Sequence, residues 1–426
     1  MKKLLATILT VVLGVSVLAG CGNSNKSETS DTSSQSEQTS AVSQAKEPKE
    51  LTFWHYFTSI NGETVQKYVD EYNAMQDDVK INFEFVPRDE LLKQFTIGLV
   101  SGELPDMTFV DNPDHASFSA MGLFADITDK VQAWEDGNKF LEGALNSAKY
   151  NGRIYGLPHA SNALALYYDV DMLAAAGVQP PETWEELEAA AAKLTSGNTY
   201  GLAFSAIKNE EGTFQMLPFL LSSGATVDTL DSAGGVKALT FLSDLTNKGY
   251  VSKEVLNWAQ GDVEKQFVSG NAAMIINGPW IKANLQKNAP DKNWAVTKLP
   301  KDKEFASTLG GENIVILNNS EVTDEAWEFL KWFMSKENNI EFCKTVGRFS
   351  PRSDVTPEEV WGDDAVMKVF ADQMQYAQPR GPHPKWPEVS AVIINAVQES
   401  LSGVKEPAQA LKDAQVKIDE INSTLK

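Results

Sequence analysis

The chain has 426 residues and a formal net charge of -21, with 37 basic and 58 acidic side chains. This excess of negative charge repels nucleic acids and anionic lipids, so it excludes polyanions as the main binding partners. Of the two cysteines, only Cys343 lies in the part that we expect to fold, so no disulfide can form there and we expect Cys343 to be a buried, small hydrophobic residue.

Residues 1–20 have the features of an export signal. Two lysines precede an apolar run that is too short to span a membrane comfortably. The run ends in the sequence LAGC at residues 18–21, which resembles a bacterial lipobox and predicts cleavage before Cys21 and acylation of this cysteine. Two or more acyl chains anchor an otherwise soluble protein to a bilayer surface. An ordinary cleaved signal, with a cysteine there by chance, is the alternative.

Residues 21–49 consist mainly of Ser, Thr, Gln, Asn and scattered charges, with almost no apolar side chains. Such a segment cannot bury enough surface to offset the entropy that is lost on ordering, so we predict a flexible tether. The remaining chain is long enough for two domains of ordinary size.

Strand-like and helical patterns alternate in the part that follows. The predicted strands are 51–57, 79–87 and 106–111, and the predicted helices between them are 65–75 and 91–99. Strand, helix, strand, helix and strand with short connections predict an α/β fold with right-handed crossovers and a parallel sheet. Ligands of such sheets bind beyond the carboxyl ends of the strands, which points to residues 54–57, Asp111 and Asn112.

The rest of the chain carries a second set of such patterns. Thr183 and Glu186 form a capping box that begins a helix, and Gly197 ends it. The other predicted elements are strand-like runs at 152–173, 200–204 and 272–277, and helices at 325–335 and from Pro407 to the end of the chain. We therefore expect a second sheet in a second domain.

Sequence motifs for catalysis and for metal binding are absent. The four histidines are far apart and lack metal-binding spacing. The chain has no G-x-S-x-G elbow, no phosphate-binding loop and no G-x-G-x-x-G. We therefore expect no metal ion, no cofactor and no enzymatic activity, although sequence spacing leaves a glycosidase-like pair of carboxylates open.

The sequence AAMIINGPW at residues 272–280 joins an apolar run to an Asn-Gly-Pro turn that ends in Trp280. A flat indole can cover the C–H face of a pyranose ring while Asp, Glu, Asn or Arg side chains bond the ring hydroxyls. A tryptophan that fills a gap in the core is the alternative for a single aromatic residue.

Five motifs together resemble a known family. In chain order they are SGELPDMTFVDN, NGRIYGLPHASNALALYYDVDML, FVSGNAAMIINGPW, GGENIVILNNS and RGPHPKWPEVSAVIINAVQESLSGVKEPAQALKDAQ. Each is weak alone, but in this order after a lipobox they resemble the extracellular solute-binding proteins of sugar ABC transporters, the family that includes maltose-binding protein. The likeness covers essentially everything after the tether.

The resemblance implies roles for individual residues. Trp280 matches the family's sugar-stacking tryptophan, and Phe214 lies where maltose-binding protein has a stacking tyrosine. Asn162 lies where that protein has a hydrogen-bonding glutamate, and its Asp-Arg pair falls on Pro113 and Asp114, so the contacts specific to maltose are not reproduced. The predicted ligand-binding residues are Trp54, Phe57, Asp111, Asn112, Asn162, Phe214, Trp280, Glu312, Arg380 and Trp386.

Glu312 is predicted to face the ligand cleft. Two glycines precede it and permit close backbone approach, and a charged residue before the apolar sequence NIVIL is hard to place against a buried strand. A solvated position at the rim of the cleft is the alternative.

The resemblance also implies a two-lobe, periplasmic-binding-protein-like fold with a central ligand cleft. We expect the chain to cross the hinge three times, near Ala160, Gly311 and Arg352. The predicted lobes are residues 50–160 and 312–352 for the N-terminal lobe, and residues 161–311 and 353–426 for the C-terminal lobe.

The function implied by the resemblance is that of a monomeric, lipid-anchored receptor on the extracellular face of the cell membrane of a Gram-positive bacterium. It would bind an oligosaccharide by hinge closure and deliver it to the permease subunits of an ABC importer. Other solutes stay open. A glycerol phosphodiester needs clustered arginines or lysines, among which Arg88, Arg352 and Arg380 stand out. A polyamine needs several acids, of which Asp111, Asp114 and Glu312 could supply some. A secreted carbohydrate-active enzyme is the third alternative.

Overall fold

The computed structural model describes residues 47–425. The predicted signal at 1–20, the lipobox cysteine Cys21 and almost all of the predicted tether at 21–49 lie outside the described residues, so these expectations stay predictions. Within the described part, no helix is both long enough and apolar enough to cross a bilayer.

The first sheet has the strand order β12-β11-β3-β1-β2, and β6 is also paired with β11. Its strands are β1 (Lys49–His55), β2 (Val79–Phe85), β3 (Met107–Asp111), β6 (Leu157–Asn162), β11 (Ser307–Ile316) and β12 (Ala377–Pro379). β1 is parallel to both β2 and β3, as the sequence predicts. The sequence does not predict that β11 joins this sheet: it returns from late in the chain and runs antiparallel to β3.

Two strands of this sheet end earlier than predicted. β1 ends at His55, and the next residues lead into α1 (Ser59–Met75). β2 ends at Phe85, because Pro87 has no N–H to donate to the sheet and immediately precedes α2 (Arg88–Ser101). Phe85 is more than half exposed, so the predicted alternation of buried residues does not continue to the end of β2.

The second sheet has four strands in the order β10-β7-β9-β8. These are β7 (Ala165–Asp169), β8 (Tyr200–Ala203), β9 (Ala272–Asn277) and β10 (Trp294–Thr297). β8 and β9 are parallel, whereas β7 is antiparallel to β9 and to β10. The predicted second sheet, with strands near 200–204 and 272–277, is confirmed by the pairing of β8 with β9. All six residues of β9 are buried.

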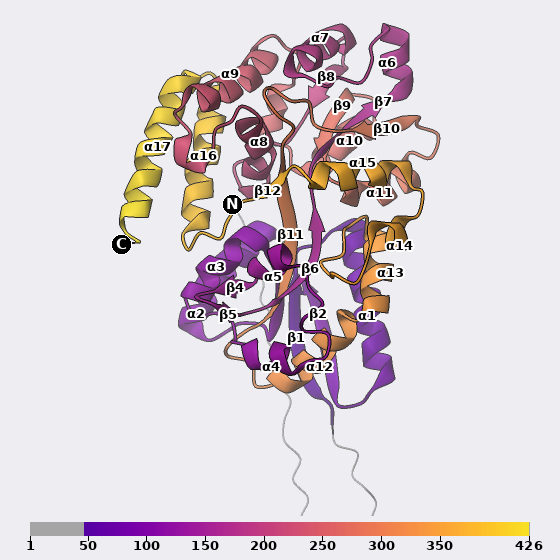
Figure 1. Ribbon diagram of the computed structural model, residues 1–426, viewed down its shortest axis with the longest axis vertical. Helices are drawn as coiled ribbons and strands as arrows, with labels where there is room; N and C mark the ends of the chain where they lie inside the picture. Colours follow the sequence, from indigo (N-terminus) through magenta and orange to yellow (C-terminus); the bar gives the residue numbers. More distant parts are fainter. Residues whose placement is uncertain (1–46, 426) are drawn as a thin grey trace, which may run out of the picture. The chain divides into compact units, whose positions relative to one another are not determined.

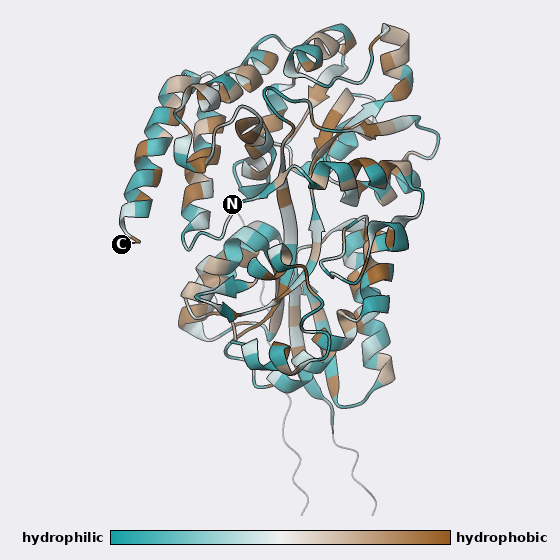
Figure 2. Cartoon of the chain, in the orientation of Figure 1, coloured by the Kyte–Doolittle hydropathy of each residue, from teal (hydrophilic) through white to brown (hydrophobic). Residues whose placement is uncertain are grey.

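Helices pack against both sheets (Figure 1). After α1 and α2 they are α3 (Asn112–Ala120), α4 (Thr128–Ala133), α5 (Glu142–Asn146), α6 (Val170–Ala176), α7 (Trp184–Leu194), α8 (Glu210–Ser222), α9 (Ala233–Asn247), α10 (Gln260–Val268), α11 (Lys282–Asn288), α12 (Thr323–Phe333), α13 (Lys336–Val346), α14 (Pro357–Trp361), α15 (Ala365–Met374), α16 (Trp386–Leu401) and α17 (Pro407–Ser423). The remaining short elements are β4 (Lys149–Tyr150), β5 (Arg153–Ile154) and the 3-10 turns η1 (Val227–Thr229), η2 (Lys253–Leu256) and η3 (Pro279–Ile281). Figure 2 shows hydrophilic and hydrophobic residues mixed along these helices, as expected where one face of each helix packs on a core.

Local sequence signals explain several helix boundaries. The predicted capping box of Thr183 and Glu186 is present and begins α7. The prediction that Gly197 ends this helix is wrong: Thr195 caps it in an extended conformation, and Gly197 occupies the left-handed region in the turn that follows.

Cys343 is fully buried, as predicted, and burial raises the pKa of its thiol.

The two sheets define two lobes with separate hydrophobic cores. We call the part around β1, β2 and β3 the N-terminal lobe and the part around β7, β8, β9 and β10 the C-terminal lobe. Phe53, Phe109 and Phe329 lie in the core of the first, and Leu202, Leu239 and Ile393 lie in the core of the second. β6 and β11 run side by side from one lobe into the other (Figure 1).

Two of the predicted hinge crossings fall on paired residues of β6 and β11. Gly311 pairs with Ser161, and the next residue, Glu312, pairs with Ala160. Gly311 has a φ of 150°, and a Cβ atom there would lie 2.3 Å from the carbonyl oxygen of Ala160, so only glycine fits this approach of the two strands. The lobe boundaries stay a prediction.

Arg352, the third predicted crossing, lies deep among residues of the N-terminal lobe. Its guanidinium group donates to the carboxylates of Asp136 and Asp354 and to the carbonyl oxygen of Met334. These partners use its hydrogen-bonding groups for structure, so Arg352 is not available to bind a solute.

Candidate functional site

A cavity of about 530 Å³ lies between the two lobes. It is at the carboxyl ends of β1 and β3, where the sequence predicts a ligand, and it also touches β11, the first turn of α8 and the turn after β9. Its lining residues are Tyr56, Phe57, Thr58, Ser59, Asn61, Arg88, Asp111, Asn162, Glu210, Glu211, Phe214, Ala259, Gln260, Gly261, Asp262, Glu264, Lys265, Trp280, Ile281, Asn284, Asn288, Gly310, Gly311, Glu312, Arg348 and Arg380.

Trp280 reaches the cavity because the turn after β9 is held in one conformation. The amide oxygen of Asn277 accepts from the backbone N–H of Gly278, and the hydroxyl of Tyr167 donates to the carbonyl oxygen of Gly278. The indole lies so close over Gly278 that a Cβ atom there would be 1.8 Å from Cζ3 of the ring. Trp280 is partly buried, with one part against the cores of the C-terminal lobe and another part in the cavity wall.

Two aromatic rings and two guanidinium groups form one side of the cavity. The rings of Trp280 and Phe214 are 6.4 Å apart and tilted by 37°. Arg348 lies over the ring of Trp280, with its Cζ atom 5.1 Å from the ring centroid, and Arg380 lies over Phe214 at 4.6 Å. Both contacts are in the range of cation–π interactions, so the rings are held in place from within the site.

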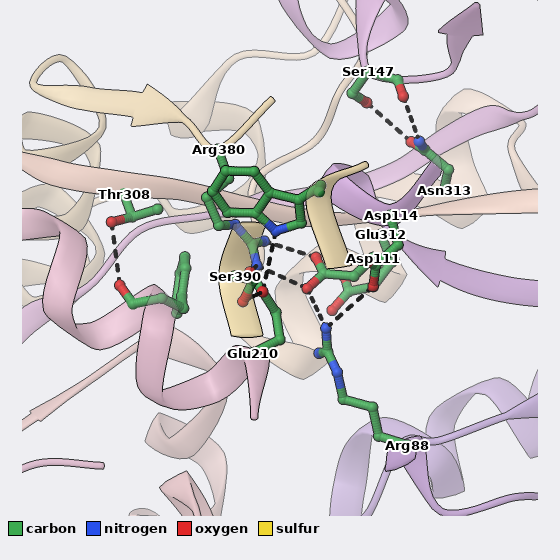
Figure 3. Close-up of polar contacts among 12 residues, drawn as sticks. Arg88, Asp111, Asp114, Ser147, Glu210, Thr308, Glu312, Asn313, Arg380 and Ser390 are labelled. Carbon is green, nitrogen blue, oxygen red and sulfur yellow. Dashed lines mark hydrogen bonds and ion pairs between the residues drawn. The ribbon is translucent and has the colours of Figure 1, made fainter. Parts of the chain in front are cut away.

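Lining residues of alternating charge are linked by ion pairs, which Figure 3 shows as dashed lines. Arg88 donates to Asp111 at 2.5 Å, and Arg380 donates to both oxygens of Asp111 at 2.7 and 2.8 Å. Arg380 also donates to Glu210 at 2.8 Å. The other oxygen of Glu210 accepts from the indole N–H of Trp386 at 3.1 Å and from the hydroxyl of Ser390.

Two carboxyl groups near Arg88, those of Asp111 and Asp114, have pKa values that are shifted in opposite directions. Burial acts to raise the pKa of Asp111, but Arg380 and Arg88 outweigh it and lower this pKa to about 2. Asp114 is 3.8 Å from Arg88, and burial together with the charge of Glu210 raises its pKa to about 8. Asp111 is thus firmly ionised at neutral pH, whereas the protonated form of Asp114 is favoured.

Glu312 lines the cavity and is paired. It is 8% exposed and accepts two hydrogen bonds from Arg348, at 3.1 and 3.2 Å. Burial raises the pKa of Glu312, and Arg348 opposes this rise. The structure therefore contradicts the alternative of a solvated glutamate at the rim.

Seven of the ten predicted ligand-binding residues line this cavity. They are Phe57, Asp111, Asn162, Phe214, Trp280, Glu312 and Arg380. Their contact with a ligand stays a prediction, but chain folding has brought together residues that are up to 323 positions apart, from Phe57 to Arg380.

The other three predicted residues lie outside the cavity lining. Trp54 is further back along β1, where it stacks on Phe95 and donates to Glu84. Asn112 begins α3 and lies beside the backbone of Gly311. Trp386 is buried in the core of the C-terminal lobe and holds Glu210, so it supports the site from behind the wall.

Sequence reasoning missed Arg348 and Glu210, which are central to the site. Glu210 is in the first turn of α8, where acidic residues are common because they favour the helix N-terminus, so its sequence position carries no distinctive signal. Arg348 follows Gly347 at the end of α13. A Cβ atom on Gly347 would lie 2.4 Å from the carbonyl oxygen of Pro279, so this glycine lets the end of α13 approach the turn that carries Trp280.

Among residues 47–425, no group of three or more His, Cys, Asp or Glu side chains is arranged to hold a metal ion. Three carboxylates of the cavity, those of Asp111, Glu210 and Glu312, are instead engaged with arginines. The site is thus equipped for hydrogen bonding and for contact with an aromatic face.

Comparison with known proteins identifies the family. A profile of the bacterial extracellular solute-binding protein family matches residues 67–369. The chain belongs to this family. Among the relatives of this solute-binding protein, the lactose-binding protein of Rhizobium radiobacter is 26% identical over 355 residues, which cover 76% of this chain and 81% of the relative. The maltotriose-binding protein of Pyrococcus abyssi is 25% identical over 377 residues, which cover 85% of this chain and 79% of the relative.

Solved structures agree with the two-lobe fold of this solute-binding protein. An ABC transporter solute-binding protein of Thermotoga lettingae, bound with α-D-tagatose, has a TM-score of 0.82 and 26% identity, and the match covers 88% of this chain and 99% of that chain. The maltose-bound MalE3 protein of T. maritima has a TM-score of 0.80 and 24% identity, with 87% and 99% covered. The second likeness concerns the fold alone.

Proposed function

We propose that this protein is the substrate-binding component of an ABC importer and captures an oligosaccharide in the cavity between its lobes. The observation that carries the proposal is the placement of Trp280 and Phe214 in a cavity wall beside a dense set of hydrogen-bonding side chains. Aromatic faces supply contact area for the C–H face of a sugar ring, and the polar groups recognise its hydroxyls. Lactose and maltotriose, which name two of the relatives, are oligosaccharides and support this ligand class.

Residues from both lobes would hold the ligand. Tyr56, Phe57 and Asp111 follow or end strands of the N-terminal lobe, while Phe214 and Trp280 belong to the C-terminal lobe. A sugar that contacts both sets binds the closed form more tightly than the open form, and this difference in affinity shifts the population toward closure. The proposed hinge comprises the paired residues of β6 and β11 and a third crossing near Arg352.

The cellular setting is also a proposal. Acylation of Cys21 would anchor the protein on the extracellular face of the membrane of a Gram-positive bacterium, and the segment 21–49 would act as the tether. The folded part would work as a monomer and pass its sugar to the permease subunits without altering it.

Equilibrium calorimetry with three solute classes tests the proposal. Neutral oligosaccharides, glycerol phosphodiesters and polyamines are titrated into the protein, and we expect binding by the first class only. Sugar recovered unchanged after prolonged incubation separates a receptor from a carbohydrate-active enzyme. Tight binding of a phosphodiester or a polyamine without any sugar would refute the proposal.

Trp280→Ala makes the test specific to the site. Loss of a buried aromatic anchor weakens binding by about 2 kcal/mol, or roughly 30-fold. Trp332→Ala is the matched control, because Trp332 is also partly buried but packs against the core of the N-terminal lobe. Equal loss of sugar affinity in both variants would show that the effect is one of stability.

A further inference from the structure

The arginines of the cavity are already matched by carboxylates. Arg348 is paired with Glu312, and Arg88 and Arg380 share Asp111. Arg380 has Glu210 as a second partner. Each guanidinium group in the lining therefore has at least one ionic partner from the protein itself, so a bound anion would not find a free arginine.

These ion pairs are buried, which makes them costly to break. Asp111, Glu312, Arg348 and Arg380 are each less than 9% exposed. An anionic ligand that takes a guanidinium group from its carboxylate leaves that carboxylate buried without its partner, and such an unpaired buried charge is strongly unfavourable. An uncharged ligand imposes no such loss, because it can bond to the pair without separating it.

The remaining charges of the lining also disfavour anions. Four cationic side chains line the cavity, namely the three arginines and Lys265, against six carboxylates. Lys265 itself is paired with Asp262 at 2.9 Å. The cavity therefore has an excess of negative groups, as does the whole chain, and the repulsion adds to the cost of breaking an ion pair.

Several buried polar atoms in lining residues have no hydrogen-bond partner within the described part of the chain. They are the Nε atoms of Arg348 and Arg380, the amide oxygen of Asn162 and the hydroxyl of Tyr56. The first two are donors, the third is an acceptor, and the tyrosine hydroxyl can be either. A mixed set of donors and acceptors matches sugar hydroxyls, which both donate and accept, better than it matches a carboxylate or phosphate, which only accepts when ionised.

We infer that this site selects uncharged sugars over sugar acids and sugar phosphates, and that Asp111 and Glu312 are the specificity-determining residues because they neutralise the arginines. The inference rests on the proposed function and adds the charge class of the ligand. Both carboxylates act on selectivity through the guanidinium groups that they occupy. Their loss should therefore release an anion-binding group.

A matched pair of ligands measures this selectivity. The probes are the neutral oligosaccharide that binds most tightly in calorimetry and the same sugar oxidised at a primary hydroxyl to the uronate. We expect wild-type protein to bind the neutral sugar at least about 100-fold more tightly than the uronate. Uronate binding that equals or exceeds neutral binding would overturn the inference while leaving the proposed sugar receptor intact.

Two variants and one control identify the residues responsible. Asp111→Asn and Glu312→Gln should each narrow the preference for the neutral sugar by at least about 10-fold, because each releases a guanidinium group for the uronate. Glu264→Gln is the control, because it changes the charge of the lining by the same amount. Glu264 accepts a hydrogen bond from Asn284, so its replacement releases no arginine, and this variant should keep the wild-type preference for the neutral sugar. If Asp111→Asn does not fold, Glu312→Gln decides, since it frees Arg348 alone.

The outcomes separate the inference from the proposed function. If Glu264→Gln reduces the preference for the neutral sugar as much as the two test variants do, overall charge alone explains the selectivity and the role of the ion pairs is overturned. A folded Glu312→Gln variant that keeps the full wild-type preference would overturn this role as well. If neither sugar binds wild-type protein, the proposed function fails, and the inference fails with it.

Discussion

Replacing Gly278 with alanine should displace Trp280 without removing any atom of the site. A Cβ atom at residue 278 would lie 1.8 Å from Cζ3 of the indole and 2.2 and 2.3 Å from two further ring atoms. Ordinary contact begins at about 3.4 Å, so the ring must move by about 1.6 Å or adopt another rotamer. The φ of Gly278 is -97°, which alanine adopts readily, so the effect comes from the clash with the ring and not from backbone strain.

The expected result follows from the two environments of Trp280. Forcing extra volume into a packed position costs about 1–3 kcal/mol of stability, and because Trp280 is only partly buried we expect the lower part of this range. A displaced ring loses its contact with the sugar, so we expect binding to weaken by about 1–2 kcal/mol, or roughly 5-fold to 30-fold. Calorimetry gives the affinity and thermal unfolding gives the midpoint on the same sample.

Gly261→Ala is the control for this experiment. Gly261 also lines the cavity, but a Cβ atom there would have no neighbour within 4 Å. This variant leaves Trp280 in place, so its affinity should stay close to that of the wild type. Its midpoint should be equal to that of the wild type or slightly higher, because alanine favours α10, which contains residue 261. If Gly278→Ala binds sugar within 2-fold of wild type while its midpoint falls, Trp280 is a core residue and the reasoning on the site is refuted.

Three further predictions address other parts of the chain. Arg352→Met should lower the free energy of unfolding by about 3 kcal/mol, because it leaves the partners of a buried guanidinium group unpaired. Denaturant unfolding should show this loss, and calorimetry should show an unchanged sugar affinity of the folded protein. A loss of affinity in a fully folded variant would place Arg352 in the binding process. The raised pKa of Asp114 in the folded state, about 8 against 3.8 for the free side chain, means that its contribution to stability falls as pH rises from about 4 to about 8. Asp114→Asn should therefore gain thermal midpoint relative to wild type with increasing pH in this window, and a constant difference would show that Asp114 does not titrate there. Cys21→Ala should leave the protein unlipidated and largely released or unprocessed, which cell fractionation measures; a variant that stays membrane-bound at the mature size contradicts the lipobox prediction.

The sequence predicts the elements of this fold better than their assembly. The strands near 200–204 and 272–277 and the capping box at Thr183 depend on neighbouring residues, so local patterns were sufficient to find them. The antiparallel entry of β11 into the first sheet depends on pairing with β3, some 200 residues earlier, and no local pattern contains that information.

The same division applies to the site. The turn chemistry around Trp280 is local, and the position of Asp111 follows from the rule on carboxyl ends of strands, so both could be predicted. Glu210 and Arg348 could not, because their role comes from partners such as Arg380 and Glu312 that are distant in sequence. Trp386 lies behind the cavity wall and not in its lining, and the sequence could not show this, because its burial and its bond to Glu210 depend on the tertiary structure.

A crystal structure of the complex with the tightest-binding neutral oligosaccharide tests the central claim most directly. The account predicts a sugar ring against Trp280, with hydroxyl groups bonded to residues of both lobes and the ion pairs of Asp111 and Glu312 preserved. A sugar bound elsewhere on the protein, or in the cavity with Trp280 covered by protein side chains and out of contact, would contradict it.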